Sequence, residues 1–337
     1  MSKFNVAILG ASGVVGQSLL KILHERNFPI AELFPLGRSH SEGDFVDFAG
    51  RSKEIIDVEK FDWSQAHIAF FSAGSEASLK WAPIATEQGC IVIDNTSAFR
   101  QDHDVPLIIP EVNPERIADF RQRYIIANPN CSTIQMLVAL KPIYDAVGIE
   151  RIHVSTYQSV SGTGKKAIEE LSSQCVQMLQ GKPAEPQVYP RQIAFNVIPQ
   201  IDEFMDNDFT KEEMKMHWET QKILGDDRVN VNATAVRVPV FFGHSESIYV
   251  QTQQAFDVAE IKSLLKEAPG LTLLEQNHEF PTPVPQGSGQ DSVYVGRVRQ
   301  DISHPYGLNL WVVADNVRKG AALNSIQIAE HVLEYLI

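Results

Sequence analysis

The stretch FNVAILGASGVVG, residues 4–16, decides the fold that we predict for this chain. Its apolar first half predicts a buried strand, and a helical pattern of leucines follows as far as Leu23. The glycines in between let the backbone turn tightly and approach a pyrophosphate, whose charge the amides at the helix start would meet. The commonest dinucleotide fingerprint has glycine at the first, third and sixth places, and this spacing differs from it. A tight turn with no ligand is therefore the alternative to a nucleotide site.

Apolar runs of strand length continue beyond this unit and alternate with helical patterns. Several of them end in a small polar turn, and in an open parallel sheet those carboxyl ends line the ligand crevice. With about six strands before residue 131, the pattern predicts a Rossmann-like, doubly wound parallel sheet. The runs that follow the first strand are 32–36, 68–71, 90–93, 107–110 and 124–127.

Arg38 lies just after the second strand, where an NAD-specific site usually carries an acidic residue. Its guanidinium offers paired hydrogen bonds to a 2′-phosphate, so we expect NADP rather than NAD. The alternative is a solvated surface arginine. Arg100 follows the fourth strand and is able to reach the same crevice, although its position alone favours the surface.

The stretch NPNCST, residues 128–133, places a thiol where a strand ends and a helix begins. The unpaired amides and the positive end of the helix dipole favour an anion there, and so the thiolate of Cys131. Such a thiolate is a nucleophile for a carbonyl, and we expect the amides after Asn130 to stabilise the oxyanion that results. The alternative is a buried structural cysteine.

The second half of the chain changes from continuous apolar runs to alternation. Residues 151–158 alternate as a half-buried antiparallel strand does, and the glycine-serine turn at 159–166 is able to hold a nicotinamide amide or a phosphate. We predict a mixed, largely antiparallel sheet with a broad face for dimerisation. The further strands and the closing helix are expected at 247–256, 293–299, 308–313 and about 321–336.

These patterns divide the chain into two domains. The domains that we expect are a nucleotide-binding domain at 1–130, completed by the C-terminal helix at about 317–337, and an α+β catalytic and dimerisation domain at 131–316. The proline-rich region 180–196 is expected to form a long loop.

Arg237 and His244 interrupt a run that otherwise predicts a core strand. On one uninterrupted strand they would face opposite ways, so a shared site requires a bend, which Pro239 and Gly243 allow. His244 would then serve as the base beside Cys131. The alternative is an exposed or structurally satisfied ring.

Residues 210–213 match a capping box, which gives Glu213 a structural role at the start of a helix that ends near Leu224. Glu212 and Lys215 share a face of this helix. They form either a surface ion pair or part of a site, and the sequence pattern alone favours the surface pair.

The composition sets limits on function. A chain of 337 residues with 44% hydrophobic and 21% charged residues is long enough for two domains with proper cores. A formal net charge of −13 without a basic stripe argues against nucleic-acid binding. Cysteines at 90, 131 and 175 are odd in number and lack paired spacing, so we expect no disulfide framework, no metal site and a cytoplasmic location. No signal peptide and no run of about 18 apolar residues appears, so no membrane span is expected.

Taken in order, five motifs closely resemble those of the aspartate-β-semialdehyde dehydrogenase family across nearly the whole chain. Many members of that family carry a second cysteine where this chain has Ala235, a difference that we expect to affect packing rather than chemistry. The motifs are GASGVVG at 10–16, NPNCST at 128–133, TYQSVSG at 156–162, VRVPV at 236–240 with GHS at 243–245, and ADNVRKGAA at 314–322.

The resemblance implies a role for individual residues. It makes Cys131 the nucleophile and His244 the general acid/base. The substrate residues that it implies are Gln158, Arg237 for the carboxylate and Glu212 for the amino group, and the phosphate residues are Arg100, Lys215 and Asn130. The cofactor residues that it implies are Gly10, Ser12, Gly13, Val14, Val15, Arg38, Ser39, Ser161, Gly162 and Asn316.

The activity implied by the resemblance is reversible, NADPH-dependent reductive dephosphorylation of L-aspartyl-4-phosphate to L-aspartate-4-semialdehyde. It would proceed through a thioester on Cys131, use inorganic phosphate as co-substrate and no metal, and serve the synthesis of lysine, methionine, threonine, isoleucine and diaminopimelate by a homodimer.

Three other functions remain open at this point. A reductase for another acyl phosphate, such as N-acetylglutamyl phosphate, would leave Glu212 without a free amino group to bind. A paralogue that binds NADP or a partner without catalysis would have no need of Cys131, Gln158, Arg237 and His244 together. A cysteine hydrolase would leave Arg38 and the glycine turn unexplained.

Overall fold

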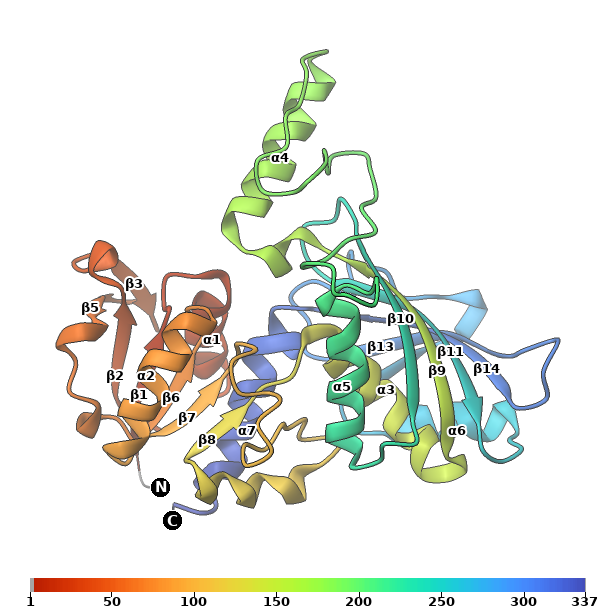
Figure 1. The fold of residues 1–337 in the computed structure, drawn as a ribbon, viewed down its shortest axis with the longest axis horizontal. Coiled ribbons are helices and arrows are strands. Elements are labelled where there is room, and N and C mark those ends of the chain that lie inside the picture. The colour runs from red at the N-terminus through yellow and green to blue at the C-terminus, as the bar shows by residue number, and fades with distance from the viewer. Residues whose placement is uncertain (1–2, 337) are drawn as a thin grey trace. The chain divides into compact units, whose positions relative to one another are not determined.

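The computed structural model describes residues 3–336 and divides the chain into two compact units (Figure 1). Unit 1 comprises Met1–Pro129 and Ala321–Ile337, and unit 2 comprises Asn130–Gly320. No helix within residues 3–336 is long and apolar enough to cross a membrane.

Unit 1 is built on a six-stranded, fully parallel sheet with the order β5-β2-β1-β6-β7-β8. The strand order reverses at β1, so the turn that follows β1 lies at the topological switch point, where such sheets bind their ligands. The predicted fold class is confirmed. The strands are β1 (Phe4–Leu9), β2 (Ile30–Gly37), β5 (Ile56–Asp57), β6 (Ile68–Phe71), β7 (Ile91–Asp94) and β8 (Ile125–Ala127), with a separate hairpin of β3 (Phe45–Phe48) and β4 (Arg51–Glu54).

The strand predicted at residues 107–110 is wrong. Leu107 forms only an isolated bridge to Ala127, and the short β5 is the sixth strand instead. The side chain of Asn113 takes the backbone groups that a strand partner would need. It accepts from Ile109 N at 3.0 Å and donates to Leu107 O at 3.0 Å.

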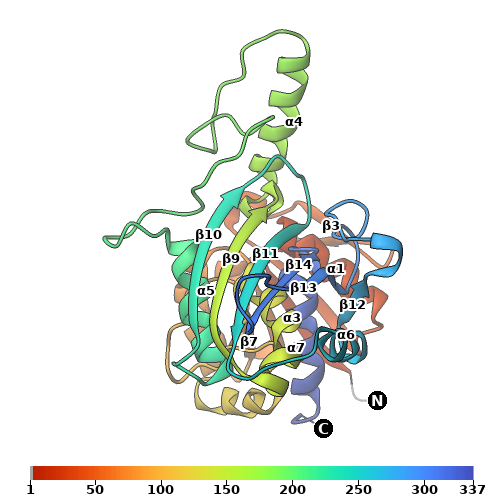
Figure 2. The ribbon, with the colours of Figure 1, turned by 90° about the vertical axis from the view of Figure 1, so that its right-hand side faces the viewer.

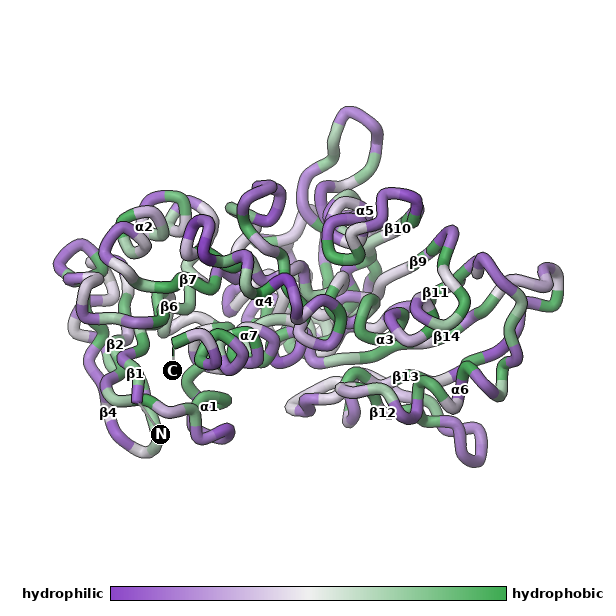
Figure 3. The backbone as a smooth tube through the Cα atoms, turned by 90° about the horizontal axis from the view of Figure 1, so that it is seen from below, coloured by the Kyte–Doolittle hydropathy of each residue, from purple (hydrophilic) through white to green (hydrophobic). Residues whose placement is uncertain are grey.

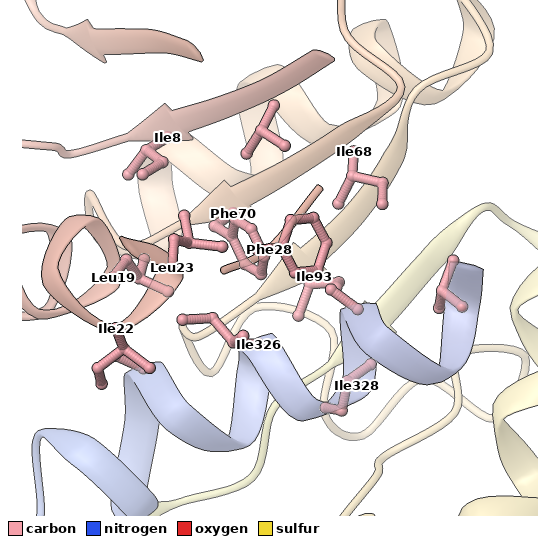
Figure 4. Packing of buried hydrophobic residues seen from close by; sticks show 14 of the residues in the cluster. Ile8, Leu19, Ile22, Leu23, Phe28, Ile68, Phe70, Ile93, Ile326 and Ile328 are labelled. Carbon is pink, nitrogen blue, oxygen red and sulfur yellow. The ribbon is translucent and has the colours of Figure 1, made fainter. Parts of the chain in front are cut away.

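The core of unit 1 lies between the sheet, α1 (Val14–Glu25) and the C-terminal helix α7 (Leu323–Leu333), while α2 (Ser75–Glu87) packs against β7. Figure 4 shows Ile326 of α7 beside Leu23 and Phe70, all of them buried. Each such side chain contributes about 1.5–3 kcal/mol when it is fully buried. The last helix therefore stabilises a domain whose strands all lie at least 196 residues earlier in the sequence, since β8 ends at Ala127 and α7 begins at Leu323.

Unit 2 contains a mixed sheet with the order β10-β9-β11-β14-β13-β12, in which the outer pairs are parallel and the inner pairs antiparallel (Figure 2). This confirms the mixed, largely antiparallel sheet. The helices α3 (Cys131–Val147), α5 (Lys211–Leu224) and α6 (Val258–Glu267) pack on it. The strands are β9 (Ile149–Gln158), β10 (Asn230–Arg237), β11 (His244–Thr252), β12 (Leu271–Leu274), β13 (Val293–Gln300) and β14 (Gly307–Ala314).

The helix α4 (Lys165–Leu179) stands away from this sheet, and the loop over residues 180–196 that follows it contains no helix or strand, as predicted. The loop and α4 have a small core of their own, formed by Leu171, Ile193 and Ile198 with their neighbours. Hydrophobic residues concentrate in the strands of the sheets, whereas many of the connecting loops are hydrophilic (Figure 3).

Candidate active site

Cys131 is the first residue of α3, and Asn130 caps this helix. Asn130 is extended and buried, and its Oδ1 accepts from the amides of Ser132 at 3.0 Å and Thr133 at 3.3 Å. Gly320 packs on the other side of the cysteine, since a Cβ at this glycine would lie 2.9 Å from Cys131 Cβ. The thiol thus occupies the predicted junction, between a capped helix start and a glycine that leaves room for it.

Glu212 is buried beneath this helix start rather than on the surface, so the surface ion pair favoured by the sequence pattern is wrong. Its Oε1 accepts from Asn130 Nδ2 at 2.8 Å, and its Oε2 accepts from Lys215 Nζ at 3.2 Å. Burial acts to raise the pKa of Glu212, but Lys215, the Asn130 amide and Arg237 outweigh it and hold this pKa below its usual value. Glu212 is therefore a buried carboxylate at the site.

Gln158 and Arg237 are neighbours because β9 and β10 run parallel and end side by side. Gln158 donates through Nε2 to Ser132 Oγ at 2.9 Å and to Glu212 Oε1 at 3.2 Å. The guanidinium of Arg237 donates through Nη1 to Ser159 O at 2.6 Å, while its buried Nε has no hydrogen-bond partner. A buried donor without a partner is costly, so this edge of Arg237 is suited to an incoming carboxylate.

The bend predicted between Arg237 and His244 is confirmed, because β10 ends at the first residue and β11 begins at the second. His244 is fully buried, and its Nδ1 accepts from Ser159 N at 3.1 Å. Burial, reinforced by the charge of Arg237, holds the pKa of His244 well below its usual value. A backbone N–H is only a donor, so the neutral ring carries its proton on Nε2.

Gly162 lies against the ring of His244 at Nε2. A Cβ at this glycine would lie 3.5 Å from His244 Nε2 and 3.2 Å from Arg237 Nη1, and Nε2 itself has no hydrogen-bond partner. An Nε2–H group without an acceptor is available to donate a hydrogen bond.

Asn316, which follows β14, joins the loops around the histidine. Its Oδ1 accepts from Ser159 Oγ at 3.0 Å and from Gly243 N at 2.9 Å, and its Nδ2 donates to Ser161 Oγ at 3.0 Å. Asn316 and Ser161, which were predicted to contact the cofactor, are therefore brought together in unit 2.

The remaining predicted residues belong to unit 1. Gly10 has φ +91, a conformation that favours glycine, and a Cβ at Gly16 would lie 2.2 Å from Gly10 O, so both glycines are required by the turn. Ser12 to Val15, which are predicted to contact the cofactor, lie in this turn and at the start of α1. Arg38, followed by Ser39, comes directly after β2, the neighbour of β1.

Arg100 is buried, and its Nη2 donates to Asn95 O at 3.0 Å. The surface position favoured by its place in the sequence is therefore wrong, because the side chain is buried and bonded to the turn after β7.

Sequence reasoning missed several residues that support the site. Ser159 orients His244, Gly320 makes room for Cys131, and Glu219 accepts from Asn130 N at 2.7 Å. For Glu219 a signal existed, because positions 212, 216, 219 and 223 of α5 are buried at helical spacing and define its inner face. No cluster of three or more His, Cys, Asp or Glu residues suited to a metal ion occurs in the described part of the chain.

Comparison with known proteins identifies the class. A family model described as "Semialdehyde dehydrogenase, NAD binding domain" matches residues 5–120, and one described as "Semialdehyde dehydrogenase, dimerisation domain" matches residues 140–319. Together with the parallel sheet of unit 1, these matches define an oxidoreductase of the semialdehyde dehydrogenase class with a nicotinamide-nucleotide domain. The chain belongs to the aspartate-semialdehyde dehydrogenase family.

Individual relatives agree with this assignment. The chain is 68% identical to an aspartate-semialdehyde dehydrogenase of Shewanella violacea over 97% of each protein. It is similar to the crystal structure of aspartate semialdehyde dehydrogenase II complexed with ASA from Vibrio cholerae, with 60% identity, a TM-score of 0.98 and 99% of each chain covered. A probable aspartate-semialdehyde dehydrogenase from Pseudomonas aeruginosa has 34% identity and a TM-score of 0.95 over the full length of both chains.

Proposed function

We propose that the protein converts L-aspartyl-4-phosphate and NADPH reversibly to L-aspartate-4-semialdehyde, NADP and inorganic phosphate. This step would supply the synthesis of lysine, methionine, threonine, isoleucine and diaminopimelate from aspartate. The observation that carries the proposal is the junction at Cys131, where a capped helix start presents a thiol among buried groups suited to an amino acid. The names of the relatives agree with it.

Cys131 is the nucleophile of the proposed reaction. Its thiolate attacks the acyl carbon, the bond from that carbon to the phosphate oxygen breaks, and a thioester forms as inorganic phosphate leaves. The helix dipole of α3 favours the thiolate before attack. Bound NADPH supplies the hydride that reduces the thioester, and collapse of the resulting thiohemiacetal breaks the C–S bond and restores the thiol.

Among the helix-start amides that the sequence suggested for the oxyanion of these steps, those of Ser132, Thr133 and Ile134 already have acceptors. The amides of Ser132 and Thr133 donate to Asn130 Oδ1, and the amide of Ile134 donates to Asn130 O at 2.9 Å. His244 Nε2–H is the donor that we assign to the substrate oxygen. A preorganised donor of this kind contributes about 3–4 kcal/mol to the transition state.

The position of the proton on the His244 ring also determines its role in proton transfer. The ring begins neutral, with its proton on Nε2, so it is able to donate a hydrogen bond to the substrate oxygen, whereas transfer of a proton requires that the ring first binds a second one on Nδ1. In the reverse direction a base is needed for the thiohemiacetal hydroxyl, and Nε2 of the neutral ring serves as one only when the proton is on Nδ1, where Ser159 Oγ at 3.1 Å is able to accept it. The contact from Ser159 N to Nδ1 favours the tautomer with the proton on Nε2.

The substrate is held by charges of both signs. We assign Arg237 to the α-carboxylate through its unpartnered edge and Glu212 to the α-ammonium group. Lys215 and Arg100 are assigned to the phosphate, and Asn130, whose side chain is engaged with Glu212 and the α3 amides, supports the helix start beside it. Gln158 is assigned to contact the substrate or the thioester that it forms with Cys131.

The turn that follows β1 in unit 1 is suited to a nicotinamide nucleotide. The turn from Gly10 to Gly13 brings bare backbone and the start of α1 together, which suits a pyrophosphate. Arg38 at the end of the neighbouring strand offers a charged donor for a 2′-phosphate, which is the basis of the preference for NADP.

A homodimer is the proposed assembly, and the sheet of unit 2 offers the surface for it. Its exposed face carries the ring pair Tyr157–Trp311 at 5.6 Å and the pair His153–Tyr249 at 6.0 Å, with Tyr157 37% exposed. Aromatic residues of this kind are enriched in subunit interfaces. The family model that covers this region is described as a dimerisation domain.

A choice of substrates tests the proposed specificity. The wild type is expected to oxidise L-aspartate-4-semialdehyde and to leave N-acetylglutamate semialdehyde untouched, whereas Glu212→Gln should lose at least about tenfold in kcat/KM for the first substrate, because the ammonium group loses its charged partner. Equal turnover of the acetylated substrate would contradict the assignment of Glu212. Binding of NADP with no turnover of either aldehyde would favour the non-catalytic paralogue.

A further inference from the structure

Asn130, the residue before the proposed nucleophile, donates hydrogen bonds to two carboxylates of one helix. Glu212 and Glu219 lie two turns apart on the buried face of α5. Glu212 accepts from the side-chain amide of Asn130 at 2.8 Å, and Glu219 Oε2 accepts from the backbone amide of Asn130 at 2.7 Å. Both the backbone and the side chain of Asn130 are therefore fixed from the same element.

The backbone contact has no substitute within the helix that it supports. Asn130 is extended, with φ −60 and ψ 142, so its N–H lies outside the hydrogen-bond ladder of α3. Pro129, which precedes it, has no N–H of its own. A buried amide without an acceptor costs about 1–3 kcal/mol, so the chain would have to move or admit water if Glu219 were removed.

We propose that Glu219 is a positioning residue for Cys131. By holding the Asn130 amide it sets the direction in which α3 begins, and the thiol is the first side chain of that helix. Glu219 is fully buried, so it acts through Asn130 and not on the substrate. Its negative charge beside the positive end of α3 adds to the stability of this arrangement. The inference rests on the proposed role of Cys131 as nucleophile.

Glu213 provides a matched control on the same helix. It is also a buried carboxylate that accepts from two backbone amides, Thr210 N at 2.7 Å and Ala235 N at 2.9 Å, but it does not bond to Asn130. Replacement of Glu213 removes a comparable amount of buried hydrogen bonding from α5. It leaves the hydrogen bonds from Asn130 to Glu212 and Glu219 in place.

The test compares Glu219→Ala, Glu219→Gln and Glu213→Ala in full-length protein. Misplacement of a reacting group by about 1 Å costs up to about 100-fold, so we expect Glu219→Ala to lower kcat roughly 10- to 100-fold with little change in KM. Glu219→Gln keeps an acceptor oxygen and should recover most of that loss. Glu213→Ala should lower the melting temperature but keep kcat within about threefold of the wild type.

A second readout follows the thiol directly. The rate of alkylation by iodoacetamide is measured in a Cys175→Ser background, since Cys175 is half-buried and Cys90 is fully buried. Glu219→Ala should change the alkylation rate of Cys131 several-fold, and Glu213→Ala should not.

Two outcomes would overturn the inference. One is that Glu219→Ala and Glu213→Ala reduce kcat equally, which would make the role of Glu219 one of general stability. The other is that Glu219→Ala keeps the kcat and alkylation rate of the wild type. If Glu219→Ala does not fold, Glu219→Asp, which falls short by one methylene, takes its place and must have a lower kcat than Glu219→Gln. Failure of the proposed role of Cys131 as nucleophile would be distinguishable from these outcomes, because Cys131→Ala would then remain active.

Discussion

The variant Glu246→Gln is expected to be more stable than the wild type at neutral pH. Glu246 on β11 is fully buried, and neither of its carboxylate oxygens has a hydrogen-bond partner. Burial raises its pKa well above the usual range, and the neighbouring Gln135 opposes this only in part. The introduced amide remains neutral at every pH and is able to donate to Gln135 Oε1, which has no hydrogen-bond partner either.

The size of the effect follows from the linkage between protonation and folding. In the unfolded chain the carboxyl ionises near its usual pKa of about 4.5, while the folded protein keeps the proton because its pKa is raised. Stability that is present below the unfolded pKa is therefore lost as pH rises towards the folded pKa, at about 1.4 kcal/mol per pH unit. Glu246→Gln has no carboxyl at this position and so does not lose this stability. Its stability relative to the wild type should therefore increase with pH between the unfolded and the folded pKa of Glu246.

The assay is thermal unfolding of both proteins at pH values from 5 to 7.5 at constant ionic strength. For a unit of this size about 1.4 kcal/mol corresponds to a shift of roughly 3–5 °C, so the two melting temperatures should separate by about that amount per pH unit. A constant difference across the range would refute the reasoning. A stability advantage of Glu246→Gln over the wild type that is smaller at pH 7.5 than at pH 5 would refute it as well.

Other predictions concern the site itself. Gly162→Ala places a methyl group 3.2 Å from Arg237 Nη1 and 3.5 Å from His244 Nε2 and should lower kcat at least about tenfold, as measured by steady-state kinetics. Gly320→Ala would bring a Cβ within 2.9 Å of Cys131 Cβ and should slow alkylation of the thiol, with unchanged alkylation as the contrary result. Arg38→Leu should raise the KM for NADP about 10- to 100-fold and leave the KM for NAD nearly unchanged, because a charge-assisted hydrogen bond contributes about 1.5–3 kcal/mol; an equal rise for both would remove the basis of the predicted preference.

Local sequence patterns were sufficient for the parts of the fold that depend on neighbouring residues. The glycine turn after β1, the helix start at Cys131, the capping box of α5 and the bend before His244 all lie where the patterns predict. Each depends on residues within a few positions of one another.

The features that the sequence did not reveal depend on distant partners. Residues 107–110 have the composition of a strand, but Asn113 takes their backbone groups. The tautomer of His244 is set by Ser159, which lies 85 positions away. Glu212 appeared to be a surface residue because a charged pair on a helix usually faces solvent, and its burial is compensated by Asn130 and Lys215.

The central claim is that Cys131 forms an acyl intermediate that phosphate must release. The measurement is the appearance of NADPH after mixing the enzyme with L-aspartate-4-semialdehyde and NADP, followed by absorbance with and without phosphate. We expect a burst of about one equivalent per site without phosphate, continuous turnover with it, and neither in Cys131→Ala. Sustained turnover in the absence of phosphate, or activity in Cys131→Ala, would contradict the account.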